Sequence, residues 1–130
     1  MIVVDASVLV TALADDGDDG DRARARLHGE RLAAPQLVDL EITSAWRRLA
    51  AAGHLDERRV QLALDDLRSL RMDRVAHAPL IGRCWELRDT LTVYDAAYVA
   101  VAELMDAALV TADARLARSP GPRCRIELLP

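Results

Sequence analysis

Short apolar segments alternate with amphipathic helical patterns along this chain, and no other feature restricts its fold as strongly. Residues 2–4 are continuously apolar, as expected for a short parallel strand that is buried on both faces. A helical pattern from Ser7 to about Ala14 follows directly. The repeated order of strand and helix predicts an α/β domain with three layers, α/β/α, around a central and mainly parallel sheet.

The remaining elements follow from the same patterns. Further strands are expected at 31–34, 71–75, 108–111 and 124–128. Helices are expected at 37–52, closed by Gly53, and at 56–70, 79–89, 114–118 and from Thr92, as the N-cap, through Met105. The acid-rich stretch 15–21 is either a turn or a helix start. It does not fit a calcium loop, and the favoured interpretation is a solvated loop that leads into a helix through Leu27. No repeat or linker divides the chain, so we expect a single domain over residues 1–130.

The composition excludes several kinds of chemistry. All seventeen basic residues are arginine, so a P-loop ATPase, a Schiff-base enzyme and a phosphoacceptor domain with an active-site lysine are ruled out. The net charge of −4 argues against a generally basic nucleic-acid binder. No apolar run has the length of a membrane span and no secretory signal is visible, so we expect a cytoplasmic protein without a membrane partner. Cys84 and Cys124 suit a reduced protein, although their spacing leaves a disulfide open.

Four acidic residues stand where a carboxylate is costly. They are Asp5 after the first apolar segment, Glu41 within a helical pattern, Asp95 at the start of a long apolar run, and Asp113 after another strand. In a helix, none of them has an arginine three or four residues away. Burial without a partner costs roughly 2–7 kcal/mol even for an uncharged polar group. We therefore expect the four carboxylates to gather around a divalent cation.

Each acid also has a purely structural explanation. Asp5 and Asp113 could cap the helices that follow them. Asp95 lies three residues after Thr92, which is the spacing of a capping box. Glu41 is the hardest to explain in this way, because acids with apolar neighbours in the middle of a helix are uncommon. Function and capping thus remain alternatives for three of the four acids.

The expected positions of the acids favour a shared site. Asp5 and Asp113 would both lie just beyond the carboxyl ends of parallel strands, where open α/β sheets bind ligands. Ser7 and Thr111 place hydroxyl groups two residues from these acids, either to support them or to cap a helix. A site built only from oxygen ligands favours Mg²⁺ or Mn²⁺ over zinc.

Four stretches in this order resemble the PIN-domain ribonucleases, especially the VapC toxins of VapBC toxin–antitoxin pairs. They are VVDASVL at 3–9, LVDLEI at 37–42, YDAAYVAVAE at 94–103 and LVTAD at 109–113. Each stretch alone is a weak signal, but the four at these separations are fairly specific and extend over nearly the whole chain. The fold that the resemblance implies is a PIN-like α/β/α domain.

The resemblance also implies a function for these residues. Asp5, Glu41, Asp95 and Asp113 would hold Mg²⁺ or Mn²⁺, with Ser7 and Thr111 supporting the acidic cluster, and a metal-activated water would cleave RNA endonucleolytically. A cognate antitoxin would inhibit the enzyme, and a homodimer is expected. Arg115 is the candidate contact to RNA, with a solvated helix position as its alternative. The acidic stretch 15–21 follows Asp5 closely, where it could repel phosphates or point away.

Two other functions are compared with this one. A catalytically silent PIN-like module would bind RNA or a protein partner, and its binding would be indifferent to EDTA. A phosphatase with an aspartyl nucleophile would need a second acid two positions after the first, where Ser7 stands instead. Retention of all four acids favours the metal-dependent ribonuclease over the silent module.

Overall fold

Five strands form the central sheet in this computed structural model, which describes residues 1–130. They are β1 (Ile2–Val4), β2 (Leu32–Pro35), β3 (Asp73–Val75), β4 (Ala108–Thr111) and β5 (Ile126–Leu128). Their order in the sheet is β3-β2-β1-β4-β5, and all four neighbouring pairs are parallel. The expected parallel sheet is confirmed, and the residues of β1 and β2 are fully buried, as their apolar sequences require.

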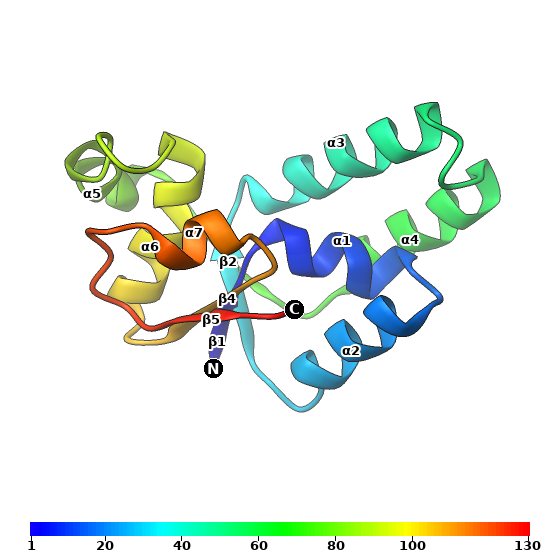
Figure 1. Ribbon diagram of the computed structural model, residues 1–130, viewed down its shortest axis with the longest axis horizontal. Helices are drawn as coiled ribbons and strands as arrows, with labels where there is room; N and C mark the ends of the chain where they lie inside the picture. Colours follow the sequence, from blue (N-terminus) through cyan, green and yellow to red (C-terminus); the bar gives the residue numbers. More distant parts are fainter.

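Helices cover both faces of this sheet (Figure 1). They are α1 (Ala6–Ala14), α2 (Asp18–Leu27), α3 (Val38–Ala51), α4 (Glu57–Ser69), α5 (Ile81–Glu86), α6 (Val93–Leu104) and α7 (Ala114–Arg118). In Figure 1, α5 and α6 lie on one side of the strands and α1 to α4 on the other. Helix α6 packs on β1, β2 and β4, while α1 packs on β4 and on α2, α3 and α4. The three-layer α/β/α architecture is thereby confirmed. None of the helices has the length and apolar character needed to cross a bilayer.

The helix expected over 79–89 is wrong in extent. A 3₁₀ turn (Ala78–Leu80) precedes α5, and α5 itself ends at Glu86. The backbone N–H of Arg88 then donates to the carbonyl of Trp85, which tightens the chain into a turn. Leu87 and Leu91 on either side of the turn are both buried, and the hydroxyl of Thr90 between them donates to the carbonyl of Pro120 (2.9 Å). A contact with the C-terminal segment thus holds the turn that replaces the end of the expected helix.

The acid-rich stretch 15–21 contains a helix start, which is the alternative to the favoured interpretation as a solvated loop. Helix α2 begins at Asp18, so the acids of its first turn lie at the positive end of the helix dipole. The Asp15 carboxylate accepts hydrogen bonds from the backbone N–H groups of Gly17 (3.2 Å) and Gly20 (2.9 Å). These bonds satisfy donors at the start of the helix that have no partner within it.

Asp16, within the same stretch, lies away from the carboxyl end of β1. Asp16 forms a two-pronged ion pair with Arg59 of α4, and Arg59 also donates to the carbonyl of Leu13. The nine residues of α1, about 14 Å at 1.5 Å per residue, separate this ion pair from Asp5. Asp16 therefore stabilises a contact between α1 and α4 at the far end of α1, whereas Asp19 lines a hollow together with Ser7.

The close approach of Gly20 to the chain at Asp15 gives a stability prediction. A Cβ atom at Gly20 would lie only 1.9 Å from the carbonyl oxygen of Asp15, so Gly20→Ala should lower the free energy of unfolding by about 1–3 kcal/mol. Gly82, in α5, has no atom within 4 Å of its ideal Cβ position. Gly82→Ala is the matched control and should raise the stability by about 0.5–1 kcal/mol. Urea unfolding of both variants measures the two effects, and equal effects would contradict this account.

Candidate functional site

The strand order places a topological switch point at the carboxyl ends of β1 and β4. From β1, the chain adds β2 and β3 on one side of the sheet and later β4 and β5 on the other. Ligands of open α/β sheets bind in the crevice outside the strand ends at such a point. Asp5 directly follows β1, and Asp113 lies two residues beyond Thr111, the last residue of β4. The sheet therefore brings two acids from distant parts of the sequence to one edge.

Asp5 is held inside this edge and does not cap α1. Its side chain is mostly buried, with the residue only 7% exposed, and it makes no capping hydrogen bond although it occupies the N-cap position. One carboxylate oxygen, Oδ2, accepts hydrogen bonds from the hydroxyls of Ser7 (2.6 Å) and Thr111 (2.8 Å). Capping is therefore not the reason for this acid, and the two hydroxyls fix its orientation.

The two hydroxyl groups also connect the loops that follow β1 and β4. Ser7 Oγ accepts from the backbone N–H of Ala112 (3.0 Å), and Thr111 Oγ1 accepts from the backbone N–H of Asp113 (3.0 Å). Each hydroxyl thus donates to Asp5 and accepts from the β4 loop. The structure gives both of them the supporting position that the resemblance implies, and Ser7 caps no helix.

Helix caps form next to Asp95 and at Asp113, as the structural explanation of these two acids predicts. Asp113 Oδ1 accepts from the backbone N–H groups of Arg115 (2.9 Å) and Leu116 (3.4 Å), so it caps α7. Thr92 caps α6 by accepting from the backbone N–H of Asp95 (3.1 Å). Capping of α7 leaves Oδ2 of Asp113 available to other groups.

Tertiary structure supplies a basic partner that helical spacing does not. The Arg115 guanidinium lies 3.8 Å from Asp95 Oδ2 and 3.7 Å from Asp113 Oδ2. Its side chain is 76% exposed, so these ion pairs are screened by water and contribute little to stability. Arg115 therefore partly neutralises two of the acids through contacts that a ligand can displace.

Tyr98 is the residue of this site that sequence reasoning missed. Its side chain is fully buried, and its hydroxyl donates a 2.5 Å hydrogen bond to Glu41 Oε1. Tyr98 follows Asp95 by three residues on α6, so the two side chains share one side of the helix. The three-residue spacing from Asp95 is the sequence signal that could have placed Tyr98 at the site. The apolar run around Tyr98 instead favoured a role in core packing.

The acids influence one another electrostatically. Burial raises the pKa of the Glu41 carboxyl, the Tyr98 hydrogen bond opposes that rise, and the charges of Asp5 and Asp95 add to it. Burial also raises the pKa of Asp95, and the charges of Asp5 and Asp113 raise it further. Since each of these acids lies in the field of another, the four carboxylates form one acidic cluster, defined as Asp5, Glu41, Asp95 and Asp113.

The donor atoms of the acidic cluster fit a hard divalent cation. Carboxylate and hydroxyl oxygens suit Mg²⁺ or Mn²⁺, and no His or Cys is present among them to favour zinc. A closed cage is absent from the structure, because no three Asp, Glu, His or Cys side chains are grouped closely enough to surround a metal ion. Mg²⁺ keeps several waters and commonly binds one or two carboxylates directly. The acidic cluster therefore offers the kind of donor that such an ion takes, without enclosing it.

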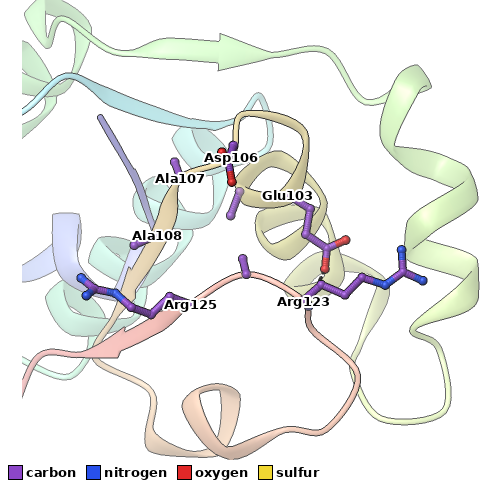
Figure 2. Close-up of a pocket in the computed structure, with 8 residues that line it drawn as sticks. Glu103, Asp106, Ala107, Ala108, Arg123 and Arg125 are labelled. Atoms are coloured by element: carbon purple, nitrogen blue, oxygen red, sulfur yellow. Dashed lines mark hydrogen bonds between the residues drawn. The ribbon is translucent and has the colours of Figure 1, made fainter.

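A separate hollow of about 500 Å³ lies between the end of α6 and the segment before β5 (Figure 2). Glu103 pairs there with Arg83 at 2.7 Å and accepts from the backbone N–H of Arg123 at 2.7 Å. Figure 2 shows the guanidinium groups of Arg123 and Arg125 pointing in different directions, so they do not converge on one anion. The contacts of this hollow attach the C-terminal segment to α5 and α6. Cys84 and Cys124 are both free thiols in the structure.

The fold and the acidic cluster define an open, parallel α/β domain with an acidic ligand site at its switch point. The model of the family described as PIN domain matches residues 2–121, and the chain belongs to that family. The VapC ribonuclease Mb0985 of Mycobacterium bovis is 45% identical over 130 residues, which is 100% of this chain and 99% of that protein. Ribonuclease VapC1 of Mycobacterium tuberculosis is 41% identical over 128 residues, covering 98% of this chain and 96% of that protein.

Solved structures agree with this assignment. PAE2754 of Pyrobaculum aerophilum superposes with a TM-score of 0.71 at 29% identity, covering 98% of this chain and 83% of that chain. VapBC2 of Rickettsia felis, bound to a DNA fragment from its promoter, gives a TM-score of 0.69 at 19% identity, with 98% of both chains covered. At that identity the second likeness shows the fold alone. The resemblance to VapC-type PIN domains is confirmed.

The contact between Tyr98 and Glu41 gives a prediction that needs no metal. Tyr98→Phe keeps the buried ring but removes the hydrogen bond that favours the charged carboxylate, so the pKa of Glu41 should rise further. NMR titration of the side-chain carboxyl carbons measures this pKa. Tyr94→Phe is the matched control, because Tyr94 lies on the same helix with an exposed side chain. An unchanged Glu41 pKa in Tyr98→Phe would show that the hydrogen bond does not form in solution.

The raised pKa of Glu41 also predicts a pH-dependent stability. An acid whose pKa is higher in the folded protein holds its proton more tightly there, so stability falls as pH rises from about 4.5 through the folded pKa. Glu41→Gln removes the charge and keeps an acceptor for Tyr98. Without divalent ions, it should raise Tm by a few degrees at pH 7, and this gain should vanish near pH 4.

Glu57→Gln provides the control for this pH series. Glu57 is an exposed glutamate in the first turn of α4, as Glu41 is in the first turn of α3. Its substitution by Gln therefore removes the same favourable interaction with a helix dipole but leaves the acidic cluster unchanged. Thermal melts of the wild type and both variants between pH 4 and pH 8 give the comparison. A Tm for Glu41→Gln at pH 7 that is no higher than that of the wild type would contradict the proposed charge crowding.

Proposed function

We propose that this protein is a Mg²⁺- or Mn²⁺-dependent endoribonuclease and the toxin of a type II toxin–antitoxin pair. The observation that carries the proposal is the acidic cluster at the switch point of a PIN domain. Full-length similarity to VapC ribonucleases at 41–45% identity supports RNA as the substrate. An antitoxin partner is supported by structural neighbours such as a toxin–antitoxin complex from Klebsiella pneumoniae. A homodimer and a cytoplasmic location belong to the same proposal.

The residues of the cluster would divide the work of holding the ion. Asp5 is the best direct ligand, because two hydroxyl donors fix Oδ2 while Oδ1 has no protein donor. Glu41 is oriented by Tyr98, and Asp95 and Asp113 complete the negative field. When bound, the ion supplies an activated water and positive charge at the scissile phosphodiester. Ser7 and Thr111 would act as positioning residues for Asp5.

Arg115 would contact the RNA. Its guanidinium is exposed beside Asp95 and Asp113, within reach of a phosphate placed at the acidic cluster. A guanidinium can bind phosphate oxygens through two parallel hydrogen bonds, which are stronger than a screened surface ion pair. An arriving phosphate would therefore draw Arg115 away from the two acids, and these acids would become available to the ion.

The test of the proposal is RNA cleavage by the purified protein. With Mg²⁺ or Mn²⁺, the wild type should cut RNA at internal positions, and EDTA should stop the reaction. Asp5→Asn keeps the shape and an acceptor for Ser7 and Thr111 but lacks the charge, so cleavage should fall more than about 100-fold, beyond the usual cost of losing an outer-shell partner.

Asp66→Asn is the control for the loss of one acidic charge, because Asp66 is exposed on α4, away from the switch point. It should cleave RNA like the wild type. Equal cleavage by Asp5→Asn and the wild type would refute the role of the acidic cluster. Binding of RNA that persists in EDTA, with no cleavage under any metal condition, would instead establish the silent binding module.

A further inference from the structure

The first turn of α3, which carries Glu41, has no side-chain cap of its own. Leu37 occupies the N-cap position, and its apolar side chain cannot accept hydrogen bonds from the free N–H groups at the start of the helix. The backbone N–H of Glu41 donates to the carbonyl of Leu37, as the helical pattern requires. Contacts that hold the chain at Leu37 and in the first turn therefore also place the backbone of Glu41.

Two contacts from β3 and the segment after it hold this part of the chain. Arg74 of β3 forms a two-pronged ion pair with Asp39 of α3, at 2.7 Å from Nε to Oδ2 and 3.0 Å from Nη2 to Oδ1. His77 Nε2 accepts a hydrogen bond from the backbone N–H of Leu37 (3.0 Å). Since β3 lies at one edge of the sheet, this edge strand and the residues after it fix the start of α3.

Arg74 is itself held in one orientation. Its guanidinium also donates to the backbone carbonyls of Leu67 (3.1 Å), Leu70 (3.3 Å) and Met72 (3.4 Å), at the end of α4 and just beyond it. With the two bonds to Asp39, the guanidinium makes five hydrogen bonds, as many as it has N–H donors. Its side chain is only 26% exposed. Arg74 is therefore a fixed cation that Asp39 meets, unlike a flexible arginine on the surface.

We propose that Arg74 and Asp39 are positioning residues for Glu41. The ion pair sets where the first turn of α3 lies relative to the sheet, and Glu41 follows Asp39 by two residues in that turn. The inference rests on the proposed function, because it concerns the same acidic cluster. Neither residue needs to touch the ion or the RNA, since both act through the backbone of α3.

The ion pair and Tyr98 hold opposite ends of the Glu41 residue. Tyr98 fixes the carboxyl end through its 2.5 Å hydrogen bond to Oε1, whereas Arg74 and Asp39 fix the backbone end. A displacement of about 1 Å at a reacting centre can lower a rate about 100-fold. Loss of the ion pair should therefore affect cleavage, and it should also disturb the hydrogen bond between Tyr98 and Glu41.

A second ion pair of the same kind provides the matched control. Arg26 of α2 binds Glu127 of β5 through Nε (2.8 Å) and Nη2 (2.9 Å), and its side chain is 24% exposed. Arg26 also pairs with Glu30, which binds the N-terminal amino group. That amino group precedes β1, whereas Asp5 follows it. Arg26→Met thus removes a similar ion pair at the end of the sheet away from the acidic cluster.

The first measurement is the rate of RNA cleavage with saturating Mg²⁺. Arg74→Met keeps the apolar stem of the side chain without the guanidinium, and its kcat should be about 10- to 100-fold lower than that of the wild type. KM for RNA should not change, because Arg74 does not contact the substrate. Asp39→Asn should act in the same direction if Arg74→Met folds poorly. Arg26→Met should keep the kcat and KM of the wild type.

The second measurement needs neither metal nor RNA. The NMR signal of the buried Tyr98 hydroxyl proton reports its hydrogen bond to Glu41, and its loss in Tyr98→Phe assigns it. The signal should shift in Arg74→Met and in Asp39→Asn, and it should stay in place in Arg26→Met. Urea unfolding should show a comparable loss of stability in Arg74→Met and Arg26→Met, so a shift confined to the first is not a general effect of destabilisation.

Several outcomes would overturn the positioning role. An unchanged kcat in Arg74→Met and Asp39→Asn does so, as does a Tyr98 signal that neither substitution moves. Equal effects of Arg26→Met would show that the loss of any such ion pair impairs the protein. A wild type that cuts no RNA would refute the proposed function alone, because the Tyr98 signal still tests whether Arg74 and Asp39 place Glu41.

Discussion

The burial of one carboxylate, Asp5, at the junction of β1 and β4 is the constraint on which the site depends. Its side chain is turned from the helix it could cap toward two hydroxyl donors, Ser7 and Thr111. Those hydroxyls accept in turn from the backbone of the β4 loop, so the carboxylate, the strand ends and the loop hold one another in place. A buried charge with two donors on a single oxygen is oriented, and it lies at the edge of the sheet where ligands of such sheets bind.

The other acids surround this fixed point at an electrostatic cost. Burial and mutual repulsion raise the pKa values of Glu41 and Asp95, and Tyr98, Thr92 and the exposed Arg115 oppose these rises. The contribution of Arg115 is weak because water screens it. The divalent cation that we propose would relieve this repulsion, and the oxygen donors suit such an ion.

Outside the site, the acids of 15–21 have a structural use. Several of them lie in the first turn of α2, and Asp16 binds Arg59 of α4. The length of α1 separates this ion pair from Asp5, although the two acids are close in sequence.

The sequence by itself determined the parallel sheet, most helix positions and the acids at the strand ends, because apolar runs and caps such as Thr92 act within a few residues. It did not determine that Tyr98 binds Glu41, 57 residues away, or that Arg115 lies between two acids, since such contacts exist only after α3, α6 and α7 meet. The end of α5 likewise depends on a distant contact, because the turn that follows it bonds through Thr90 to the carbonyl of Pro120, 30 residues away. Local sequence preferences determine where helices and strands form. Packing between elements that are distant in sequence determines which groups a buried charge contacts.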